Sequence, residues 1–206
     1  MSGNVTDKLT YERQLQSEGY KLIAGMDEVG RGPLCGPVVC AAVIMPLDES
    51  LLIDGIDDSK KVSEKKRLIL SEKIKERAIA YSICEVSPEI IDEINILEAT
   101  KLCMQNCIKN ISVRPDALLV DAVKADFGVY TRSLIKGDAL SYSIGAASIL
   151  AKVYRDKLME DYALVYPQYG FEKHKGYGTK AHIEALKAYG PTPIHRKTFI
   201  KNFVKD

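Results

Sequence analysis

The stretch GMDEVGRGPLCGPVVCAAVI, residues 25–44, contains parts of two predicted strands and the loop between them. The apolar run from Leu22 to Met26 predicts a first strand that leads into two acidic residues. The glycine and proline cluster GRGPLCGP, residues 30–37, then predicts a loop. From Val38 to Met45 the sequence is apolar and rich in β-branched residues, which is typical of a buried second strand. These two consecutive strands should pair antiparallel.

Helices are predicted where a capping residue or a proline precedes apolar residues at helical spacing. The first twenty residues contain one such helix, with Leu9, Tyr11 and Leu15 as its apolar contacts. Another should cover residues 64–79, a long one about residues 144–166, and a last one should end at Gly190-Pro191. The predicted helix starts beyond the first twenty residues are Ser63, Ser87-Pro88, Asn95 with Glu98 in capping-box spacing, about residue 144, and Thr179.

Three further strands are predicted, over Ile79–Val86, Ala117–Val120 and Ser133–Lys136. The second of these should deliver Asp121 to its end, and the third should deliver Asp138. Strands reached through helical crossovers should join the sheet in parallel. The sequence therefore predicts an α/β fold with a mixed sheet flanked by helices, and no repeat or linker divides it.

Composition excludes several classes of protein. At 206 residues, 46% hydrophobic and 28% charged, the chain suits one domain with a full core, with or without a small appendage, and not a disordered protein. Its longest apolar runs are too short to cross a membrane, and its polar start lacks the apolar core of a signal peptide. We therefore expect a cytoplasmic protein.

Cysteine spacing and charge distribution add two weaker indications. None of the five cysteines forms a CxxC pair, which does not favour a disulfide framework or a zinc knuckle, and Cys103 and Cys107 share a helix face as core residues would. Residues 1–150 carry 18 Lys or Arg against 22 Asp or Glu, and residues 151–206 carry 11 against 6. A basic C-terminal segment could bind phosphates, although solvent-exposed helix faces produce the same distribution of charge.

Four carboxylates lie where predicted strands end or just beyond: Asp27, Glu28, Asp121 and Asp138. If they converge at one edge of the sheet, they cannot all stay ionised without a cation. Hard oxygen ligands with room for a phosphate suit Mg²⁺ or Mn²⁺, and two such ions could promote phosphodiester hydrolysis. The alternative is that each acid is a surface residue at a strand terminus.

The glycine-rich loop at residues 30–36 is a candidate phosphate-binding loop, because glycines let backbone N–H groups approach an anion. It lacks the Gly-Lys-Ser/Thr of a Walker A motif. It also fits the dinucleotide fingerprint poorly, since Pro33 interrupts the turn and two acids precede it, although Asp54 lies at a suitable distance for a ribose contact.

Seven blocks of sequence occur over about residues 22–199: GMDEVGRGPLCGPVVCAAVI, DDSKKVSEKKR, NILEATKLCM, LLVDAV, KGDALSYSIGAASILAKVYRD, YPQYGFEKHKGYGT and GPTPIHRKTF. In this order they resemble bacterial ribonuclease HII, of the type 2 ribonuclease H family. Three positions differ from the residues usual there: Ala122 replaces a glycine, Gly145 an alanine and His174 an asparagine. None of these differences removes a presumed metal ligand.

The resemblance implies a ribonuclease H-like catalytic domain over residues 1–165 and a small helical, substrate-binding C-terminal extension over residues 166–206. It implies an endoribonuclease that hydrolyses the RNA strand of RNA/DNA hybrids and cuts 5′ to single ribonucleotides in duplex DNA. Two divalent metal ions, Mg²⁺ or Mn²⁺, would act, leaving 3′-hydroxyl and 5′-phosphate ends. We expect a monomer without a membrane partner; the sequence contains no convincing clamp-binding peptide, so protein partners stay unknown.

Site residues are implied by the same comparison. The metal ligands would be Asp27, Glu28, Asp121 and Asp138. Backbone groups of Gly30, Arg31 and Gly32 would read the ribose 2′-hydroxyl, which distinguishes RNA from DNA. Contacts to substrate or phosphate are implied for Tyr177, Ser59, Lys60, His195 and Arg196.

Two alternatives remain open from the sequence. The sister class, ribonuclease HIII, carries an extra N-terminal binding domain and usually another residue between the loop glycines; only 26 residues precede Asp27 here, and Arg31 is the type HII residue. The chain could also be a silent RNA/DNA-binding module, although all four acids are present.

Overall fold

A five-stranded sheet forms the centre of the computed structural model, which describes residues 8–204. The strands are β1 (Ile23–Val29), β2 (Val38–Ile44), β3 (Ala80–Val86), β4 (Ala117–Asp121) and β5 (Tyr130–Leu134), in the spatial order β3-β2-β1-β4-β5. Antiparallel pairing joins β1 to β2 and β2 to β3, whereas β1, β4 and β5 run parallel. The predicted mixed sheet is therefore confirmed.

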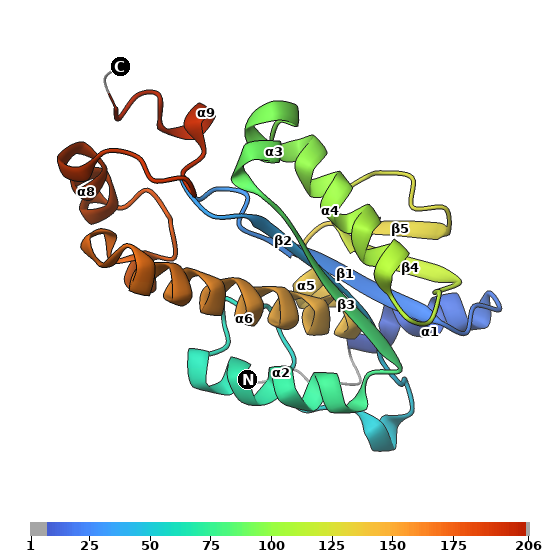
Figure 1. Ribbon diagram of the computed structural model, residues 1–206. Helices are drawn as coiled ribbons and strands as arrows, with labels where there is room; N and C mark the ends of the chain where they lie inside the picture. The colour runs from blue at the N-terminus through green and yellow to red at the C-terminus, as the bar shows by residue number, and fades with distance from the viewer. Residues whose placement is uncertain (1–7, 205–206) are drawn as a thin grey trace.

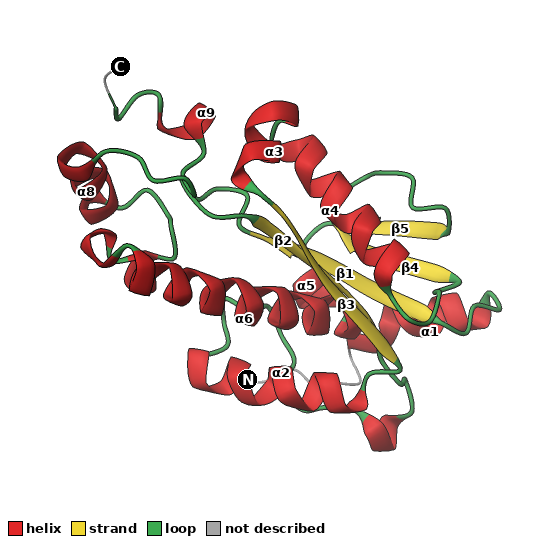
Figure 2. Ribbon diagram, viewed as in Figure 1, coloured by secondary structure: helices red, strands yellow, loops and turns green. Residues whose placement is uncertain are grey.

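Helices cover both faces of this sheet (Figures 1 and 2). On one face lie α3 (Pro88–Ile94) and α4 (Ile96–Asn110); on the other lie α1 (Thr10–Ser17), α2 (Glu64–Arg77), α5 (Gly137–Leu140) and α6 (Tyr142–Val165). Strand β2 shows the reason, because its side chains are apolar on both sides. Val38, Cys40 and Ala42 pack in the α4 cluster, and the alternate residues pack in the α6 cluster.

The long helix α6 crosses β1 at very close range. A Cβ atom on Gly25 would lie 2.0 Å from the backbone of Ser143, so only glycine permits this approach. Glu12 of α1 is buried at the start of α6, where its Oε1 accepts hydrogen bonds from Ser141 Oγ and Ser143 N. An acidic group is favourable at this positive end of the helix dipole. Helix α6 is thereby held beside the carboxylate-bearing end of β1.

The C-terminal residues extend beyond the end of α6. They contain two short turns, η3 (Pro167–Tyr169) and α7 (Phe171–His174), then α8 (Lys180–Tyr189) and α9 (Lys197–Ile200). Phe171 and Ile194 pack with Met159 of α6 and with Cys35 of the glycine-rich loop. An isolated β-bridge joins Cys35 to His195. These residues therefore bring the C-terminal segment against the loop that follows β1.

Most predicted elements are confirmed, including the caps at Asn95 and Thr179, whose side chains accept backbone N–H bonds. Ser63 is the N-cap residue of α2 as predicted, although its side chain makes no capping hydrogen bond, and the helix ends at Arg77 instead of residue 79. The predicted helix in the first twenty residues is confirmed as α1; residues 1–7 lie outside the described range.

Two strand boundaries are corrected. Strand β1 extends to Val29, because its pairing with β2 continues to the Val29–Val39 pair beyond the last pair with β4. Strand β5 covers Tyr130–Leu134 instead of residues 133–136, and Asp138 lies in helix α5. As an edge strand, β5 is only partly buried, so it lacks the apolar pattern by which the inner strands are predicted.

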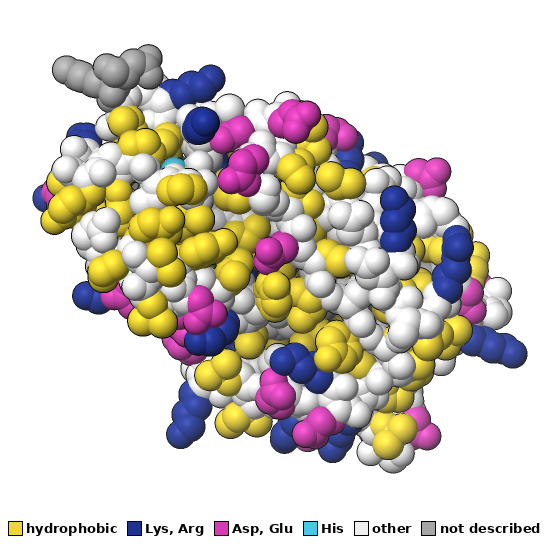
Figure 3. Space-filling model, in the orientation of Figure 1, with side chains coloured by type: hydrophobic (Ala, Val, Ile, Leu, Met, Phe, Trp, Pro, Cys, Tyr) yellow, Lys and Arg dark blue, Asp and Glu magenta, His cyan; other side chains and the backbone are white. Residues whose placement is uncertain are grey.

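The cysteines are buried or partly buried, and the charges on the face drawn in Figure 3 are mixed in sign. All five cysteines are free, and Cys103 and Cys107 are fully buried in the α4 cluster as expected. On the face drawn in Figure 3, Lys and Arg side chains alternate with Asp and Glu along the edge over α2, and the described residues of that face form no single basic patch. None of the helices within residues 8–204 is long and apolar enough to cross a membrane.

Candidate active site

Three carboxylates meet at one edge of the sheet. Asp27 lies near the end of β1, and Asp121 ends the parallel neighbour β4; the last pair between these strands is Met26 with Val120. Side chains alternate along a strand, so these two acids project from the same face as the residues that pack on α6 and α1. Asp138 reaches them from α5, and oxygen atoms of the three carboxylates lie within 4.8 Å of one another.

Backbone N–H groups hold one oxygen of each of these carboxylates. Glu28 N donates to Asp27 Oδ1 at 2.8 Å, and Ala139 N donates to Asp138 Oδ1 at 2.9 Å. Gly137 N donates to Asp121 Oδ1 at 2.7 Å, which ties the start of α5 to the end of β4. The three acids are therefore held in place by the fold before any ligand binds.

Glu28 occupies a different position from the other acids, because it projects from the opposite face of β1 to Asp27. Its Oε1 lies 3.4 Å from Arg31 Nη1. Its Oε2 is buried and has no hydrogen-bond partner among residues 8–204. A buried carboxylate oxygen without a partner is unfavourable, so the geometry fits an additional cationic ligand.

The charges of the cluster oppose one another. The pKa of Asp27 is raised well above its usual value by burial and then by the charges of Glu28 and Asp121. Burial also raises the pKa of Asp138, with added repulsion from Asp58 and Asp121. For Glu28, burial raises the pKa while the Arg31 charge opposes that shift. A divalent cation would allow all these groups to be ionised together, so the donor set fits a hard metal ion.

The acids line a cavity of about 300 Å³. Three predicted substrate residues lie in its wall: Ser59, Lys60 and Tyr177. Tyr177 comes from the C-terminal segment and is 41% exposed. The complete lining is Asp27, Glu28, Val29, Ser59, Lys60, Asp121, Asp138, Ser148, Lys152 and Tyr177.

The sequence interpretation missed two polar residues of this wall, Ser148 and Lys152. They lie four residues apart on α6 and so share one helix face, a signal that was present in the block SIGAASILAK. Ser148 Oγ donates to Ser59 Oγ at 2.9 Å, and Lys152 Nζ donates to Asp156 at 2.7 Å. Ser59 is thus buried within the protein, while Lys60 is exposed at the rim of the cavity.

The loop that contains Gly30, Arg31 and Gly32 lies beside the cavity. A Cβ atom on Gly32 would lie 3.8 Å from the ring of Tyr177, so the loop and this tyrosine are neighbours. Gly30 has a φ of +92°, and a Cβ there would lie 2.3 Å from Arg155 Nε. Glycine is therefore required at residue 30 for both conformation and space.

The expectation that His195 and Arg196 contact phosphate is corrected. His195 is 3% exposed and Arg196 is fully buried, and the guanidinium of Arg196 donates to backbone carbonyls of the glycine-rich loop. Lys175, in the same segment, pairs with Glu160 at 2.7 Å. The sequence identified these residues as polar but could not indicate that the C-terminal segment folds over them.

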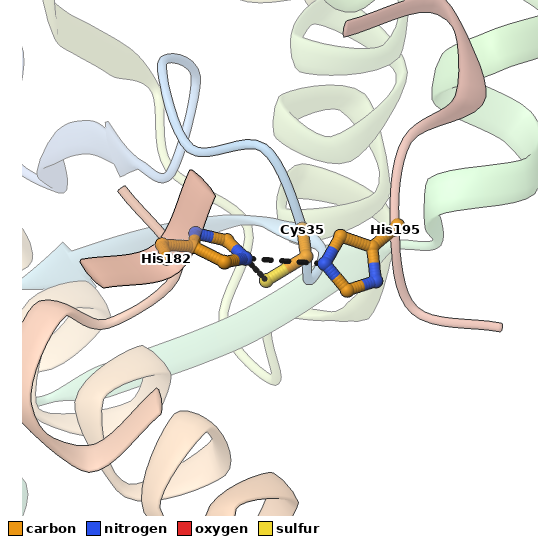
Figure 4. A group of neighbouring side chains, drawn as sticks. All are labelled: Cys35, His182 and His195. Atoms are coloured by element: carbon orange, nitrogen blue, oxygen red, sulfur yellow. Dashed lines mark hydrogen bonds between the residues drawn. The ribbon is translucent and has the colours of Figure 1, made fainter. Parts of the chain in front are cut away.

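Cys35, His182 and His195 form a second compact group of ligand-type side chains (Figure 4). His195 Nδ1 accepts from Thr192 N, so His195 Nε2 carries the proton and donates to His182 Nε2 at 3.1 Å. His182 Nδ1 in turn donates to the Tyr177 carbonyl. The proton on His195 Nε2 occupies the direction that a metal bond would need, so hydrogen bonding within the protein explains this group.

Comparison with known proteins identifies the family. The ribonuclease HII family model matches residues 24–202. Ribonuclease HII of Bacillus cytotoxicus is 52% identical over 198 residues, covering 95% of this chain and 76% of that protein. The crystal structure of ribonuclease H2 from Pyrococcus horikoshii superposes with a TM-score of 0.74 at 29% identity, over 90% of this chain and all of that one.

A more distant structure shares the fold alone. Bst-RNase HIII, solved in complex with Mn²⁺, is 17% identical with a TM-score of 0.64, over 88% of this chain and 68% of that one. The family match over residues 24–202 is far more specific than this similarity of fold. The chain belongs to the ribonuclease HII family, whose members are metal-dependent enzymes that hydrolyse the RNA strand of RNA/DNA hybrids.

Proposed function

We propose that this enzyme cuts 5′ to single ribonucleotides in duplex DNA, as well as RNA strands in hybrids, by hydrolysis that uses two divalent ions. The observation that carries the proposal is the convergence of Asp27, Asp121 and Asp138 within 4.8 Å, in a cavity that also contains Glu28 and Tyr177. A cavity with acids on one side and a tyrosine beside a glycine-rich loop on the other suits a scissile phosphate next to a ribose.

Asp27, Glu28, Asp121 and Asp138 would bind the ions, Mg²⁺ or Mn²⁺. Bound there, the ions would lower the pKa of the attacking water and stabilise the leaving oxygen, giving 3′-hydroxyl and 5′-phosphate ends. The buried, unpartnered Oε2 of Glu28 and the mutual repulsion of the other carboxylates support this assignment.

Substrate positioning would come from the opposite wall of the cavity. Lys60 is exposed at the rim, where an ammonium group can meet a phosphate without losing its hydration entirely. Ser59 would hold this wall of the cavity in place through its hydrogen bond with Ser148, and would not contact the substrate directly. Tyr177 offers a hydroxyl and a ring face to the sugar, and the Gly30–Gly32 backbone lies next to it.

We assign the C-terminal residues 166–206 to substrate binding, as an extension of a catalytic domain formed by residues 1–165. Two features support this division. Tyr177 is the cavity residue that this segment contributes, and Phe171 and Ile194 pack the segment against Cys35 of the glycine-rich loop. The extension and the loop would then close around the ribonucleotide together.

A duplex with one ribonucleotide in one strand, labelled at either end, tests the proposal. It is incubated with Mg²⁺, with Mn²⁺ and with chelator, and the products are resolved on a denaturing gel. Cleavage 5′ to the ribonucleotide is expected only in the reactions that contain Mg²⁺ or Mn²⁺. The 3′ end produced at the cut should be extendable by a polymerase. Binding without cleavage would instead support a silent RNA/DNA-binding module.

A matched carboxylate control separates the metal site from general effects of charge. Asp161 is an exposed carboxylate on α6 that pairs with Lys157 and does not line the cavity. Asp161→Asn should cleave as the parent does, whereas Asp121→Asn should not. Equal cleavage by the two variants would contradict the assignment.

A further inference from the structure

Arg196 is a fully buried guanidinium without a carboxylate partner among the described residues. It donates to three carbonyls instead. Its Nη2 lies 2.5 Å from Gly30 O, its Nη1 3.0 Å from Arg31 O, and its Nε 3.0 Å from Gly36 O. Burying a charge in this way is costly, so the hydrogen bonds to the loop must offset a large loss of hydration.

Arg155 lies on the same side of the loop and is also fully buried. It donates to Pro37 O and Cys35 O at 3.1 Å each, and to Lys175 O at 2.8 Å. Two guanidinium groups therefore support the glycine-rich loop from beneath, but through different peptide units. Arg196 binds the carbonyls of Gly30, Arg31 and Gly36, whereas Arg155 binds those of Cys35, Pro37 and Lys175.

The choice of carbonyl determines where the neighbouring N–H groups point. In a trans peptide the N–H is directed opposite to the C=O, and the described chain contains no cis peptide. Gly30 C=O shares its peptide unit with Arg31 N–H, and Arg31 C=O shares its unit with Gly32 N–H. Because Arg196 draws both carbonyls inward, both N–H groups are turned outward.

These two N–H groups are available for a ligand. Neither donates to an acceptor within residues 8–204, and both Arg31 and Gly32 are exposed. Gly32 lies beside Tyr177, which lines the cavity with the carboxylates. The guanidinium bonds also polarise the two peptide units, which strengthens their N–H groups as donors.

We propose that Arg196 is a positioning residue: by binding the carbonyls of Gly30 and Arg31, it presents the N–H groups of Arg31 and Gly32 to the ribose and its phosphate. This inference rests on the proposed recognition of a ribonucleotide by the loop. Lysine cannot replace arginine here, because one ammonium group lacks the planar fork that reaches three carbonyls at once.

A positioning role and a direct phosphate contact differ in their dependence on salt. Removing a side chain that neutralises a phosphate lowers the slope of log affinity against log salt by about 0.9 on B-form DNA. Removing a buried arginine that contacts only the protein leaves the slope unchanged. The exposed Lys60 at the cavity rim provides the positive control for the first behaviour.

Binding is measured with chelator present, so that the substrate stays uncut, on two duplexes that differ only in one ribose 2′-hydroxyl. We expect Arg196→Lys and Arg196→Ala to lower the ratio of ribonucleotide to all-DNA affinity by roughly three- to tenfold, as for loss of one hydrogen bond. Their salt slopes should match that of the parent. Lys60→Ala should instead weaken binding to both duplexes and lower the slope.

Glu12→Ala is the buried control. Glu12 is fully buried, its hydrogen bonds are with Ser141 and Ser143 at the start of α6, and it does not line the cavity. The variant should lower the thermal midpoint yet keep the affinity ratio of the parent. A lowered ratio in Glu12→Ala, or a reduced salt slope in Arg196→Ala, would overturn the inference. A parent that does not distinguish the two duplexes would instead contradict the proposed function.

A measurement on the unaltered enzyme covers the case in which the Arg196 variants do not fold. Amide resonances of Arg31 and Gly32 are followed by NMR as each duplex is added. We expect both to shift more with the ribonucleotide duplex than with the all-DNA duplex. Equal shifts with the two duplexes would show that these N–H groups do not sense the ribose, and the inference would fail.

Discussion

The acid cluster at the sheet edge and the arginines beneath the glycine-rich loop are both buried and charged, but they differ in how their charges are satisfied. Asp27 and its neighbours repel one another, and Glu28 Oε2 has no partner among the described residues. Arg196, in contrast, donates to carbonyls with all three of its nitrogens. The difference supports the proposals that the first group binds metal ions and that the second positions the loop.

The largest expected effect tests the acid cluster. Asp27→Asn and Asp121→Asn should each lower turnover by a factor of about a hundred or more, since charge stabilisation in the transition state is lost. The fold should persist, and the thermal midpoint in chelator should rise slightly because carboxylate repulsion is relieved. Gel assays and circular dichroism measure both. Near-parental cleavage would show that these acids are not the metal ligands.

A second prediction concerns the histidines in the segment that supports the loop. Burial and the neighbouring His182 lower the pKa of His195 from its usual value to about 4. Between pH 6.5 and 4 the unfolded chain binds a proton that the folded chain does not, so stability is lost as pH falls through this range. The loss should total about 3 kcal/mol at pH 4 for this group.

Replacing His195 with asparagine tests this loss of stability, because the asparagine Oδ1 can accept a hydrogen bond from Thr192 N as His195 Nδ1 does. His195→Asn should flatten the pH dependence of the free energy of unfolding between pH 6.5 and 4, measured by denaturant titration. The parent should show the steeper fall. If the two proteins lose stability in parallel, His195 is not buried as a neutral side chain.

Tyr177 lies between the two regions and should give a smaller effect. Tyr177→Phe should lower the cleavage rate on a single-ribonucleotide duplex by roughly three- to tenfold, the value of one hydrogen bond. Tyr177→Ala should lose considerably more, because packing of the ring on the sugar is removed as well. Steady-state kinetics on the two variants measure this. If Tyr177→Ala cleaves at the rate of the parent, Tyr177 is a surface residue without a role in recognition.

The smallest effect is expected at Ala122, directly after Asp121. This residue has a φ of +48°, a conformation that favours glycine, and its side chain is exposed. Ala122→Gly should therefore raise the free energy of unfolding, but by less than about 1 kcal/mol, because glycine also gains freedom in the unfolded chain. A thermal midpoint lower than that of the parent would argue against a strained backbone beside the acid cluster.

Much of the fold was predictable because it depends on local patterns. Alternating or continuous apolar runs identified β2, β3 and β4 within about one residue, and Asn95 and Thr179 identified helix starts through the chemistry of their side chains. Asp27 and Asp121 were recognisable because strand ends deliver side chains to one edge of a sheet. Asp138 was correctly grouped with them, although it reaches the cluster from a helix.

The residues that were misjudged have their partners far away in the sequence. Arg196 binds carbonyls at residues 30, 31 and 36, more than 150 positions earlier, and no local pattern separates such a side chain from a solvated one. Ser148 and Lys152 line the cavity because α6 crosses β1 closely at Gly25.

The sequence by itself determined the strand order along the chain, the helix caps and the identity of the acidic residues, since each depends on residues close together in the chain. Only the tertiary structure decided which polar side chains face the cavity and which are buried beneath it. Burial is set by the packing of distant segments, and it is burial that makes one charge available to a ligand and commits another to the backbone.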